Sequence, residues 1–378
     1  MIERLVGMDS TSHNSNLAVI DFIRAYLDDL GVDSRLTFDD AGGKANLFAT
    51  LGSADKGGVV LSGHTDVVPV EGQPWDSDPF AVTTRDGRLY GRGTADMKSF
   101  IAVCLAMAPE FLRRGLAEPI HFAFSYDEEV GCIGVRRLLA DLATLPIRPR
   151  LCIVGEPTEM RVIIGHKGKK SLRGHVHGLE CHSALAPRGV NAVEAAAEAV
   201  AHLKAMARRL RDSGPHDAEF DPPFTTIHTG VIEGGTALNI VPRYCWFDFE
   251  IRNLPGDDAE ALLAEAKGYV ERVLLPEMRA VDPASGFSWE EVNNTPGLDM
   301  RHDDEATRFV AALTGANASG RVSFGTEAGL FQQAGIPTIV CGPGSIDQAH
   351  KPNEFISLDQ VAQCEAFFFR LMDRVCLR

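Results

Sequence analysis

The sequence predicts an α/β fold, in which a mostly parallel sheet has helices on both faces and a smaller α+β domain is inserted into the chain. Short apolar runs begin at residues 58, 121, 150 and 337, and each has the length and composition of a buried strand. Helical stretches such as 96–114 separate these runs, and this alternation favours a parallel sheet. The pattern changes between 171 and 284, which indicates the inserted domain.

The first regular element is an amphipathic helix in the segment NSNLAVIDFIRAYLDDLG. Its apolar residues recur at helical spacing on one face, namely Leu17, Ile20, Ile23, Leu27 and Leu30. Asn14 or Ser15 can cap its start, and Gly31 follows its end. We therefore expect a single surface helix here.

The inserted domain contains an alanine-rich helix at 191–210, a second helix at about 257–273, and strands in TTIHTGVIEGG and RYCWFDFEIR. Two strands and two helices suit a small α+β sheet. The apolar run at 337 then returns to the first pattern. We therefore assign 1–170 and 285–378 to one domain and 171–284 to the insertion.

Composition and charge limit the classes of function. Of the 378 residues, 45% are hydrophobic and 24% are charged, which is typical of a soluble, packed protein. The formal charge is −15 and there is no long basic run, so we do not expect a nucleic-acid partner. Charges interrupt the first ten residues, and no stretch of about 18 apolar residues occurs. We expect a cytoplasmic protein with neither a signal peptide nor a membrane span.

The eight cysteines have none of the spacings that zinc ribbons or Cys-x-x-Cys motifs require. We expect most of them to be small buried residues. Any metal chemistry must therefore come from histidines and carboxylates.

Candidate metal ligands follow the predicted strands at their carboxyl ends, where an open α/β sheet binds its ligands. These residues are His64, one of the pair Glu128 and Glu129, Glu156 and His350. Asp96 is a further candidate, because it follows two glycines in GRGTADM and opens a helix. Taken singly, each residue has an ordinary explanation, such as a helix cap or a solvated side chain. Their convergence at one edge predicts a metal site.

The donor types indicate which metals fit. Two imidazoles and three carboxylates suit Zn²⁺, Co²⁺ or Mn²⁺ better than Ca²⁺ or Cu⁺. Five ligands are too many for one tetrahedral zinc ion, but two ions can share them if one carboxylate bridges. Asp96 is the natural bridge, since it alone lacks a partner of its own. Asp66 is placed to accept a hydrogen bond from the imidazole of His64.

Several motifs resemble those of one enzyme group. SGHTDVVPVEGQPWDSDPF, GRLYGRGTADMKS, SYDEEVGC, IVGEPT and HKG are similar to segments of the co-catalytic dinuclear zinc metallopeptidases. This group includes acetylornithine deacetylase, succinyl-diaminopimelate desuccinylase, aminoacylase and carboxypeptidase G. The resemblance covers essentially the whole chain, and STSHNSNL, KANLFATLG and CHSALAPRGVNAVE are most similar to the acetylornithine deacetylases of bacterial arginine synthesis.

The resemblance implies a role for each ligand. The residues matching His64, Asp96 and Glu156 hold one metal ion in that group, and those matching Asp96, Glu129 and His350 hold the other. Glu128 matches the general base that activates a metal-bridging hydroxide. We expect two divalent ions, zinc in the first place, with cobalt or manganese as alternatives.

The resemblance also implies that the inserted domain is a lid and the dimerisation domain of a homodimer. His182 in ECHSALAP matches a histidine that reaches across the dimer and stabilises the oxyanion. Asn239 and Arg252 match residues that bind substrate, and the guanidinium of Arg252 suits a carboxylate. A purely structural role is the alternative for each of the three.

The expected substrate is a small N-acyl amino acid. Glu327 in SFGTEAGLF suits the side-chain ammonium of acetylornithine, and it equally suits a surface or helix-capping position. We expect an amide hydrolase that converts N2-acetyl-L-ornithine to L-ornithine and acetate. Another N-acyl amino acid or a dipeptide is the nearest alternative substrate. A non-catalytic metal-binding protein of the same fold is the alternative outside this class.

Two residues do not fit the pattern. Ser99 stands where relatives commonly have glycine after DMK, and we expect a local adjustment rather than loss of activity. Asp127 precedes the glutamate pair, and we expect no role for it beyond turn or capping chemistry.

Overall fold

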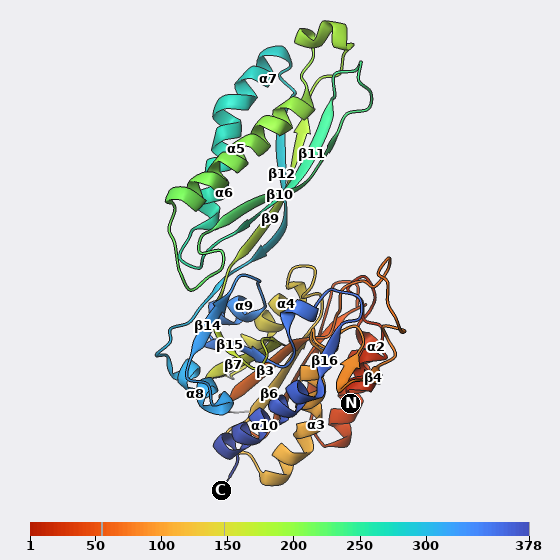
Figure 1. The fold of residues 1–378 in the computed structure, drawn as a ribbon, viewed down its shortest axis with the longest axis vertical. Coiled ribbons are helices and arrows are strands. Elements are labelled where there is room, and N and C mark those ends of the chain that lie inside the picture. Colours follow the sequence, from red (N-terminus) through yellow and green to blue (C-terminus); the bar gives the residue numbers. More distant parts are fainter. Residues whose placement is uncertain (54–55, 147, 378) are drawn as a thin grey trace. The chain divides into compact units, whose positions relative to one another are not determined.

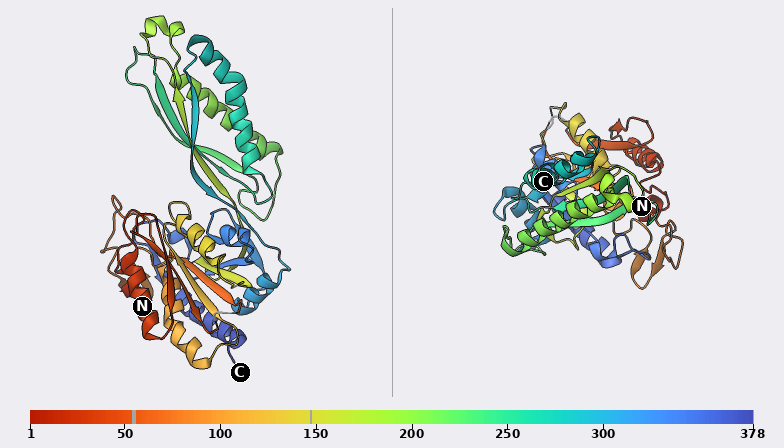
Figure 2. Two further views of the ribbon diagram at one scale, coloured as in Figure 1. Left: turned by 180° about the vertical axis from the view of Figure 1, so that it is seen from behind. Right: turned by 90° about the horizontal axis from the view of Figure 1, so that it is seen from above.

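The computed structural model describes residues 1–53, 56–146 and 148–377, shown in Figure 1 and from two further directions in Figure 2. The chain divides into two compact units. The first unit consists of Met1–Gly165, Leu298–Arg321 and Thr326–Arg378, and the second of His166–Gly297 and Val322–Gly325. Within the described residues, no helix combines the length and the apolar character that crossing a membrane requires.

The first unit is built on a mixed sheet, which has nine strands within the described residues, in the order β1-β2-β6-β3-β7-β15-β8-β13, with β14 paired to β8. The strands are β1 (Ser34–Phe38), β2 (Ala45–Leu51), β3 (Val59–His64), β6 (Ile120–Ser125), β7 (Leu151–Pro157), β8 (Val162–His166), β13 (Leu298–Asp299), β14 (Ser319–Val322) and β15 (Thr338–Gly342). The neighbours β6, β3, β7 and β15 run parallel. These four are the apolar runs of the sequence, so the predicted α/β fold with a mostly parallel central sheet is confirmed.

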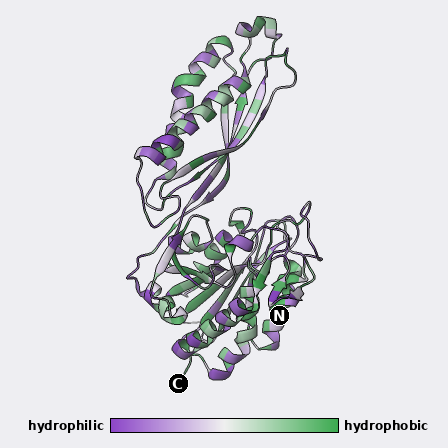
Figure 3. Cartoon of the chain, in the orientation of Figure 1, coloured by the Kyte–Doolittle hydropathy of each residue, from purple (hydrophilic) through white to green (hydrophobic). Residues whose placement is uncertain are grey.

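The central strands are apolar because helices cover both of their faces. Every residue of β3, β6, β7 and β15 is buried, and these strands are mostly green in the hydropathy colouring of Figure 3. α3 (Lys98–Arg114) and α10 (Leu358–Val375) pack together on one face, and α4 (Ile133–Leu142) and α9 (Ala328–Gln333) pack together on the other (Figure 1). The remaining helices of this unit are α1 (Ile2–Val6), α2 (Leu17–Asp29) and α8 (Glu305–Thr314).

The predicted amphipathic helix is α2, and it buries Ile20, Ile23 and Leu27 as expected. Its N-cap residue is Asn16, and the hydroxyl of Ser15, one of the two predicted caps, accepts the N–H of Leu17. The side chain of Asn16 does not cap the helix, because it bonds to the backbone of Ala45 and to the hydroxyl of Thr65 instead. Asn16 thereby ties the start of the helix to the end of β3.

A small antiparallel sheet lies in the same unit and consists of β4 (Thr83–Arg85), β5 (Arg88–Tyr90) and β16 (Phe355–Ser357). Phe355 pairs with Tyr90. This pairing brings the loop after β5, residues 91–97, next to the loop before β16, residues 350–354.

The second unit has a four-stranded antiparallel sheet in the order β10-β11-β9-β12. The strands are β9 (Lys169–His177), β10 (Thr226–Gly234), β11 (Tyr244–Arg252) and β12 (Gly286–Thr295). α5 (Ala192–Ser213) and α6 (Ala259–Tyr269), which continues through a π-helical turn into α7 (Leu275–Val281), form a core with the sheet. Leu203 and Met206 of α5 pack there with Phe247 and Phe249 of β11.

The predicted limits of the insertion differ from those of the second unit. The sequence analysis found β10 and β11 but not β9 and β12, in which charged and polar residues alternate with apolar ones. Both strands belong to the small sheet, since β9 is hydrogen-bonded to β11 and β12. The unit therefore extends to Gly297 rather than to 284, and it begins at His166, before the predicted boundary at 171.

Gly155 in β7 allows α3 to approach the sheet, since a Cβ atom there would lie 2.1 Å from ring atoms of Phe100. We expect Gly155→Ala to lower the free energy of unfolding by about 1 to 3 kcal/mol, because the buried ring must move. Urea unfolding checks this. Gly43→Ala is the control, because nothing lies within 4 Å of its Cβ position. Equal stability of the two variants would contradict the close approach.

Candidate metal centre

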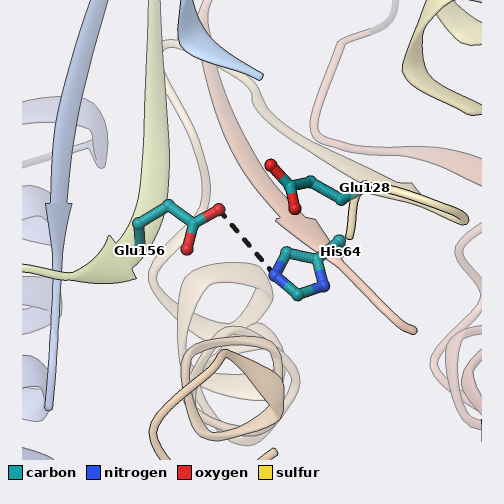
Figure 4. A group of neighbouring side chains, drawn as sticks. All are labelled: His64, Glu128 and Glu156. Carbon is teal, nitrogen blue, oxygen red and sulfur yellow. Dashed lines mark ion pairs between the residues drawn. The ribbon is translucent and has the colours of Figure 1, made fainter. Parts of the chain in front are cut away.

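The carboxyl ends of the central strands bring predicted ligands to one edge of the sheet in the first unit. β3 ends at His64, β7 contains Glu156, and the loop after β6 carries Glu128. Figure 4 shows these three side chains converging from separate segments. The dashed line joins Nε2 of His64 to a carboxylate oxygen of Glu156, 3.8 Å away.

Asp96 lies between two imidazoles. One of its carboxylate oxygens is 3.0 Å from Nε2 of His64, and the other is 3.3 Å from Nε2 of His350. The same nitrogen of His350 is 3.0 Å from Oε2 of Glu129. The structure thus brings the five predicted ligands together and gives Asp96 the central position that a bridging ligand would need.

The donor atoms of this cluster fit metal ions. Ligand atoms of His64, Asp96 and Glu129 lie within 4.8 Å of one another, as do those of His64, Glu128 and Glu156. Oε1 of Glu129 is buried and has no hydrogen-bond partner among the described residues. An unsatisfied buried carboxylate oxygen is costly, and a cation would satisfy it. Nitrogen and oxygen donors of these types suit zinc, cobalt or manganese.

The acids of the cluster repel one another and are buried. Burial, together with repulsion from Asp96, raises the pKa of Glu129 to about 7. Burial also raises the pKa values of Glu128 and Glu156 well above their usual range. Protein groups alone therefore favour protons on these carboxylates, and divalent cations would displace those protons.

The histidines show shifts that have the same origin. Burial lowers the pKa of His64, but the nearby carboxylates of Asp66, Asp96 and Glu156 outweigh it and hold this pKa well above the usual value. Hydrogen bonds to Asp96 and Glu129 raise the pKa of His350 to about 10. Each imidazole thus lies where positive charge is favoured.

Asp66 orients His64 through its backbone. Nδ1 of His64 lies 2.9 Å from the carbonyl oxygen of Asp66 and 3.6 Å from its carboxylate, so the backbone carbonyl is the nearer acceptor and the predicted carboxylate stays within ion-pair distance. Because a carbonyl only accepts, Nδ1 carries the proton and the Nε2 lone pair of a neutral ring is free for a metal. The carboxylate of Asp66 instead accepts the backbone N–H groups of Glu128 and Glu129, at 3.1 and 3.3 Å.

Asp127 is separate from the metal cluster. Its two oxygens lie 2.6 and 2.7 Å from Nζ of Lys44, which also donates to the backbone carbonyl of Ser12. The hydroxyl of Ser12 donates in turn to Asp66. Lys44 and Ser12 are thus supporting residues that the sequence analysis did not identify, although both lie in the motifs KANLFATLG and STSHNSNL.

Ser99 is accommodated without displacing the loop that carries Asp96. The serine is buried, and its hydroxyl donates to the carbonyl of Thr94 at 2.6 Å. The side chain therefore adds a hydrogen bond at the start of α3.

Glu327 stands at the N-cap position of α9, although its side chain makes no capping hydrogen bond. It is 1% exposed, and its two oxygens accept hydrogen bonds from Ser125 at 2.5 Å and Ser62 at 3.4 Å. Burial raises its pKa to about 7. The carboxylate thus lies beneath the ends of β3 and β6, and its expected contact with a substrate ammonium stays a prediction.

His182, Asn239 and Arg252 all belong to the second unit. His182 precedes a 3₁₀ helix (Ser183–Arg188), and its Nδ1 accepts the N–H of Ala184. The carbonyl of Asn239 accepts the N–H of Ser183, so His182 and Asn239 lie on adjacent segments. Arg252 ends β11 and donates to Glu250 at 2.8 Å. Their expected roles stay predictions.

Residues 60–374 match Peptidase family M20/M25/M40, and the chain belongs to this family. It is therefore a hydrolase, and the resemblance seen in its motifs is confirmed. An acetylornithine deacetylase from Proteus mirabilis is 36% identical over 374 residues, which cover 98% of this chain and 92% of that protein. One from Myxococcus xanthus is 36% identical over an alignment of 382 positions, which covers 99% of this chain and 96% of that protein.

Solved structures share the fold. An M20 family metallo-carboxypeptidase from Sulfolobus solfataricus has a TM-score of 0.76 at 16% identity, over 98% of this chain and 97% of that one. A dinuclear metal binding peptidase of the M20 family from Bacillus subtilis has a TM-score of 0.65 at 14% identity, over 98% of this chain and 95% of that one.

The pKa shifts predict how the stability of metal-depleted protein depends on pH. We expect its free energy of unfolding to fall between about pH 5 and pH 8. Folded Glu129, with its pKa of about 7, keeps a proton that the unfolded chain releases. His350 acts in the same way at pH values above the usual pKa of a histidine, because its own pKa is raised to about 10. The titration of Glu129 alone would lower the free energy of unfolding by roughly 3 kcal/mol over this range. Urea unfolding after chelator treatment measures the slope.

Glu129→Gln is the matched variant for this experiment, and we expect it to have a shallower slope below about pH 7 because it lacks the titrating group. Saturating zinc should reverse the trend, since metal binding displaces protons. Stability that rises with pH in the metal-depleted protein would contradict the raised pKa values.

Proposed function

We propose that the protein is a metal-dependent amide hydrolase that removes the acetyl group from N2-acetyl-L-ornithine, giving L-ornithine and acetate for arginine biosynthesis. The cluster of histidines and carboxylates at the edge of the parallel sheet, with Glu128 in addition to the five ligands, carries the proposal. The names of the relatives from Proteus mirabilis and Myxococcus xanthus support the substrate.

Two divalent ions, zinc in the first place, would be held by this chain. His64, Asp96 and Glu156 would bind one ion, and Asp96, Glu129 and His350 the other. The two oxygens of Asp96, each facing a different imidazole, support its role as the bridge. Bound cations of this kind polarise an amide carbonyl and lower the pKa of water.

Glu128 would act as the general base. Its backbone N–H is held by Asp66, and the thiol of Cys132 lies 3.4 Å from its Oε1. The carboxylate would take a proton from the attacking water as the C–O bond forms. It would pass that proton to the departing amine as the C–N bond breaks, leaving acetate.

The second unit would complete the enzyme as a lid and dimerisation domain. We propose that His182 stabilises the oxyanion and that Asn239 and Arg252 bind the substrate. β10 is an edge strand of its sheet and exposes Val231 and Ile232. An exposed apolar edge of this kind favours pairing with a second copy of the chain and supports a homodimer.

A related substrate, such as another N-acyl amino acid or a dipeptide, is the second candidate. The burial of Glu327, which accepts a hydrogen bond from Ser125, supports this second candidate, because a buried carboxylate is less accessible to the side-chain ammonium of ornithine. Selectivity for ornithine would then depend on other residues.

We expect Glu128→Gln to lower kcat by at least about 100-fold, because the amide cannot take a proton from water. The variant should bind as much zinc as the unchanged protein, which elemental analysis measures. Asp127→Asn is the neighbouring control and should keep most of the turnover, since Asp127 pairs with Lys44 outside the cluster. A near-normal rate for Glu128→Gln would rule out the assignment of the base.

The substrate proposal is tested with metal-depleted protein reloaded with zinc or cobalt. We expect the highest kcat/KM for N2-acetyl-L-ornithine in a panel that also contains N-acetylcitrulline, N-acetylmethionine and a dipeptide. Acetate release and free amine formation provide the measurement. A higher kcat/KM for the dipeptide would replace the deacetylase assignment with the second candidate, whereas no turnover of any compound would favour a non-catalytic protein.

A further inference from the structure

A buried glutamate outside the metal cluster fastens the loop that carries Asp96. Glu354 is fully buried, and its Oε1 accepts the backbone N–H groups of Ala95 at 2.7 Å and Asp96 at 3.0 Å. Its Oε2 accepts the N–H of Gly93 at 3.0 Å and the guanidinium of Arg92 at 2.7 Å. One carboxylate thus satisfies donors along the whole loop between β5 and α3.

The same network holds the loop that carries His350. Arg92 donates through Nη1 to the carbonyl of Lys351 at 3.3 Å and through Nη2 to Oε1 of Gln73 at 2.6 Å. The amide nitrogen of Gln73 donates to the carbonyl of His350 at 3.0 Å. Glu354 itself lies four residues beyond His350, so its position also fixes the end of this loop.

The network needs a carboxylate rather than any polar side chain. Among the described residues, both oxygens of Glu354 accept only from donors of one loop, which are three backbone N–H groups and the guanidinium of Arg92. A glutamine would turn its NH₂ group toward some of these donors and leave them unsatisfied in the interior. Gly93, at φ +83°, gives the loop the turn that aims these N–H groups at one acceptor.

We propose that Glu354 is a positioning residue that holds Asp96 and His350 in metal-binding geometry by fixing the backbone of both loops. This inference depends on the proposed metal centre. Glu354 is not one of the proposed ligands, and Arg92 and Gln73 transmit its effect to the His350 loop. The ion shared by Asp96, Glu129 and His350 is therefore the one that depends most on the network.

Glu354→Gln tests the proposal by metal binding. We call the ion held by Asp96, Glu129 and His350 the second ion. We expect the affinity of the protein for this ion to fall by about 10- to 100-fold, which is the usual effect of losing a partner that orients a ligand. Competition with a chromophoric chelator gives the two dissociation constants for Zn²⁺, and the visible absorption of the Co²⁺ form reports the altered coordination. Circular dichroism of the metal-depleted variant checks that it is folded.

Glu118→Gln is the matched control. Glu118 also pairs with an arginine, Arg150, but it does so just before β6 and β7 begin, at the opposite edge of the sheet from the metal ligands. Its metal affinities should equal those of the unchanged protein. Equal affinities in Glu354→Gln as well would overturn the proposal, whereas an unchanged protein that binds no metal would overturn the metal centre itself.

Gln73→Ala decides the question if Glu354→Gln does not fold. Gln73 is only half-buried, and the substitution removes the link between Arg92 and the carbonyl of His350. We expect a smaller loss of affinity for the second ion in a folded protein. Unchanged affinity for both ions in this variant would overturn the proposal.

Discussion

The repulsion between carboxylates at the edge of the parallel sheet is the constraint on which the rest of the site depends. Four carboxylates approach His64 in two groups, Asp96 with Glu129 and Glu128 with Glu156. Within each group, including His64, the potential ligand atoms lie within 4.8 Å of one another. Two like charges at that distance repel by roughly 3 to 4 kcal/mol at an effective dielectric constant of 20. A hydrogen bond to a charged group stabilises by about 1.5 to 3 kcal/mol, so one such bond does not hold a ligand loop in place.

Asp66 and Glu354 meet this constraint in the same way. Each carboxylate lies outside the proposed ligand set and accepts several hydrogen bonds, chiefly from the backbone of a loop that carries ligands. Asp66 holds the N–H groups of Glu128 and Glu129, and Glu354 holds those of Ala95 and Asp96. Each of the two loops therefore gains several backbone hydrogen bonds from a single carboxylate side chain, which fixes the position of the loop. The acids of the proposed metal centre are thus positioned by further acids.

The sequence predicted the central sheet and the ligand cluster because both follow from local patterns. Apolar runs mark β3, β6, β7 and β15, and parallel strands bring their carboxyl ends to one edge. The partners of Glu354 were not predicted, since Arg92 is 262 residues away, and neither was the contact of Glu327 with two serines from different strands. β9 and β12 were missed because one face of each strand is polar. Such features depend on contacts that no local pattern records.

The acids of DEEVGC differ in what opposes their charge, although they are consecutive in the sequence. Asp127 has Lys44, and Glu129 has His350 at 3.0 Å. Glu128 has no ion-pair partner among the described residues, and the neutral thiol of Cys132 is the group that approaches its carboxylate. A base that must take up and release a proton in each cycle needs a charge that no fixed cation holds. The environment of the middle acid therefore suits proton transfer, while its neighbours are suited to anchoring the loop and to binding metal.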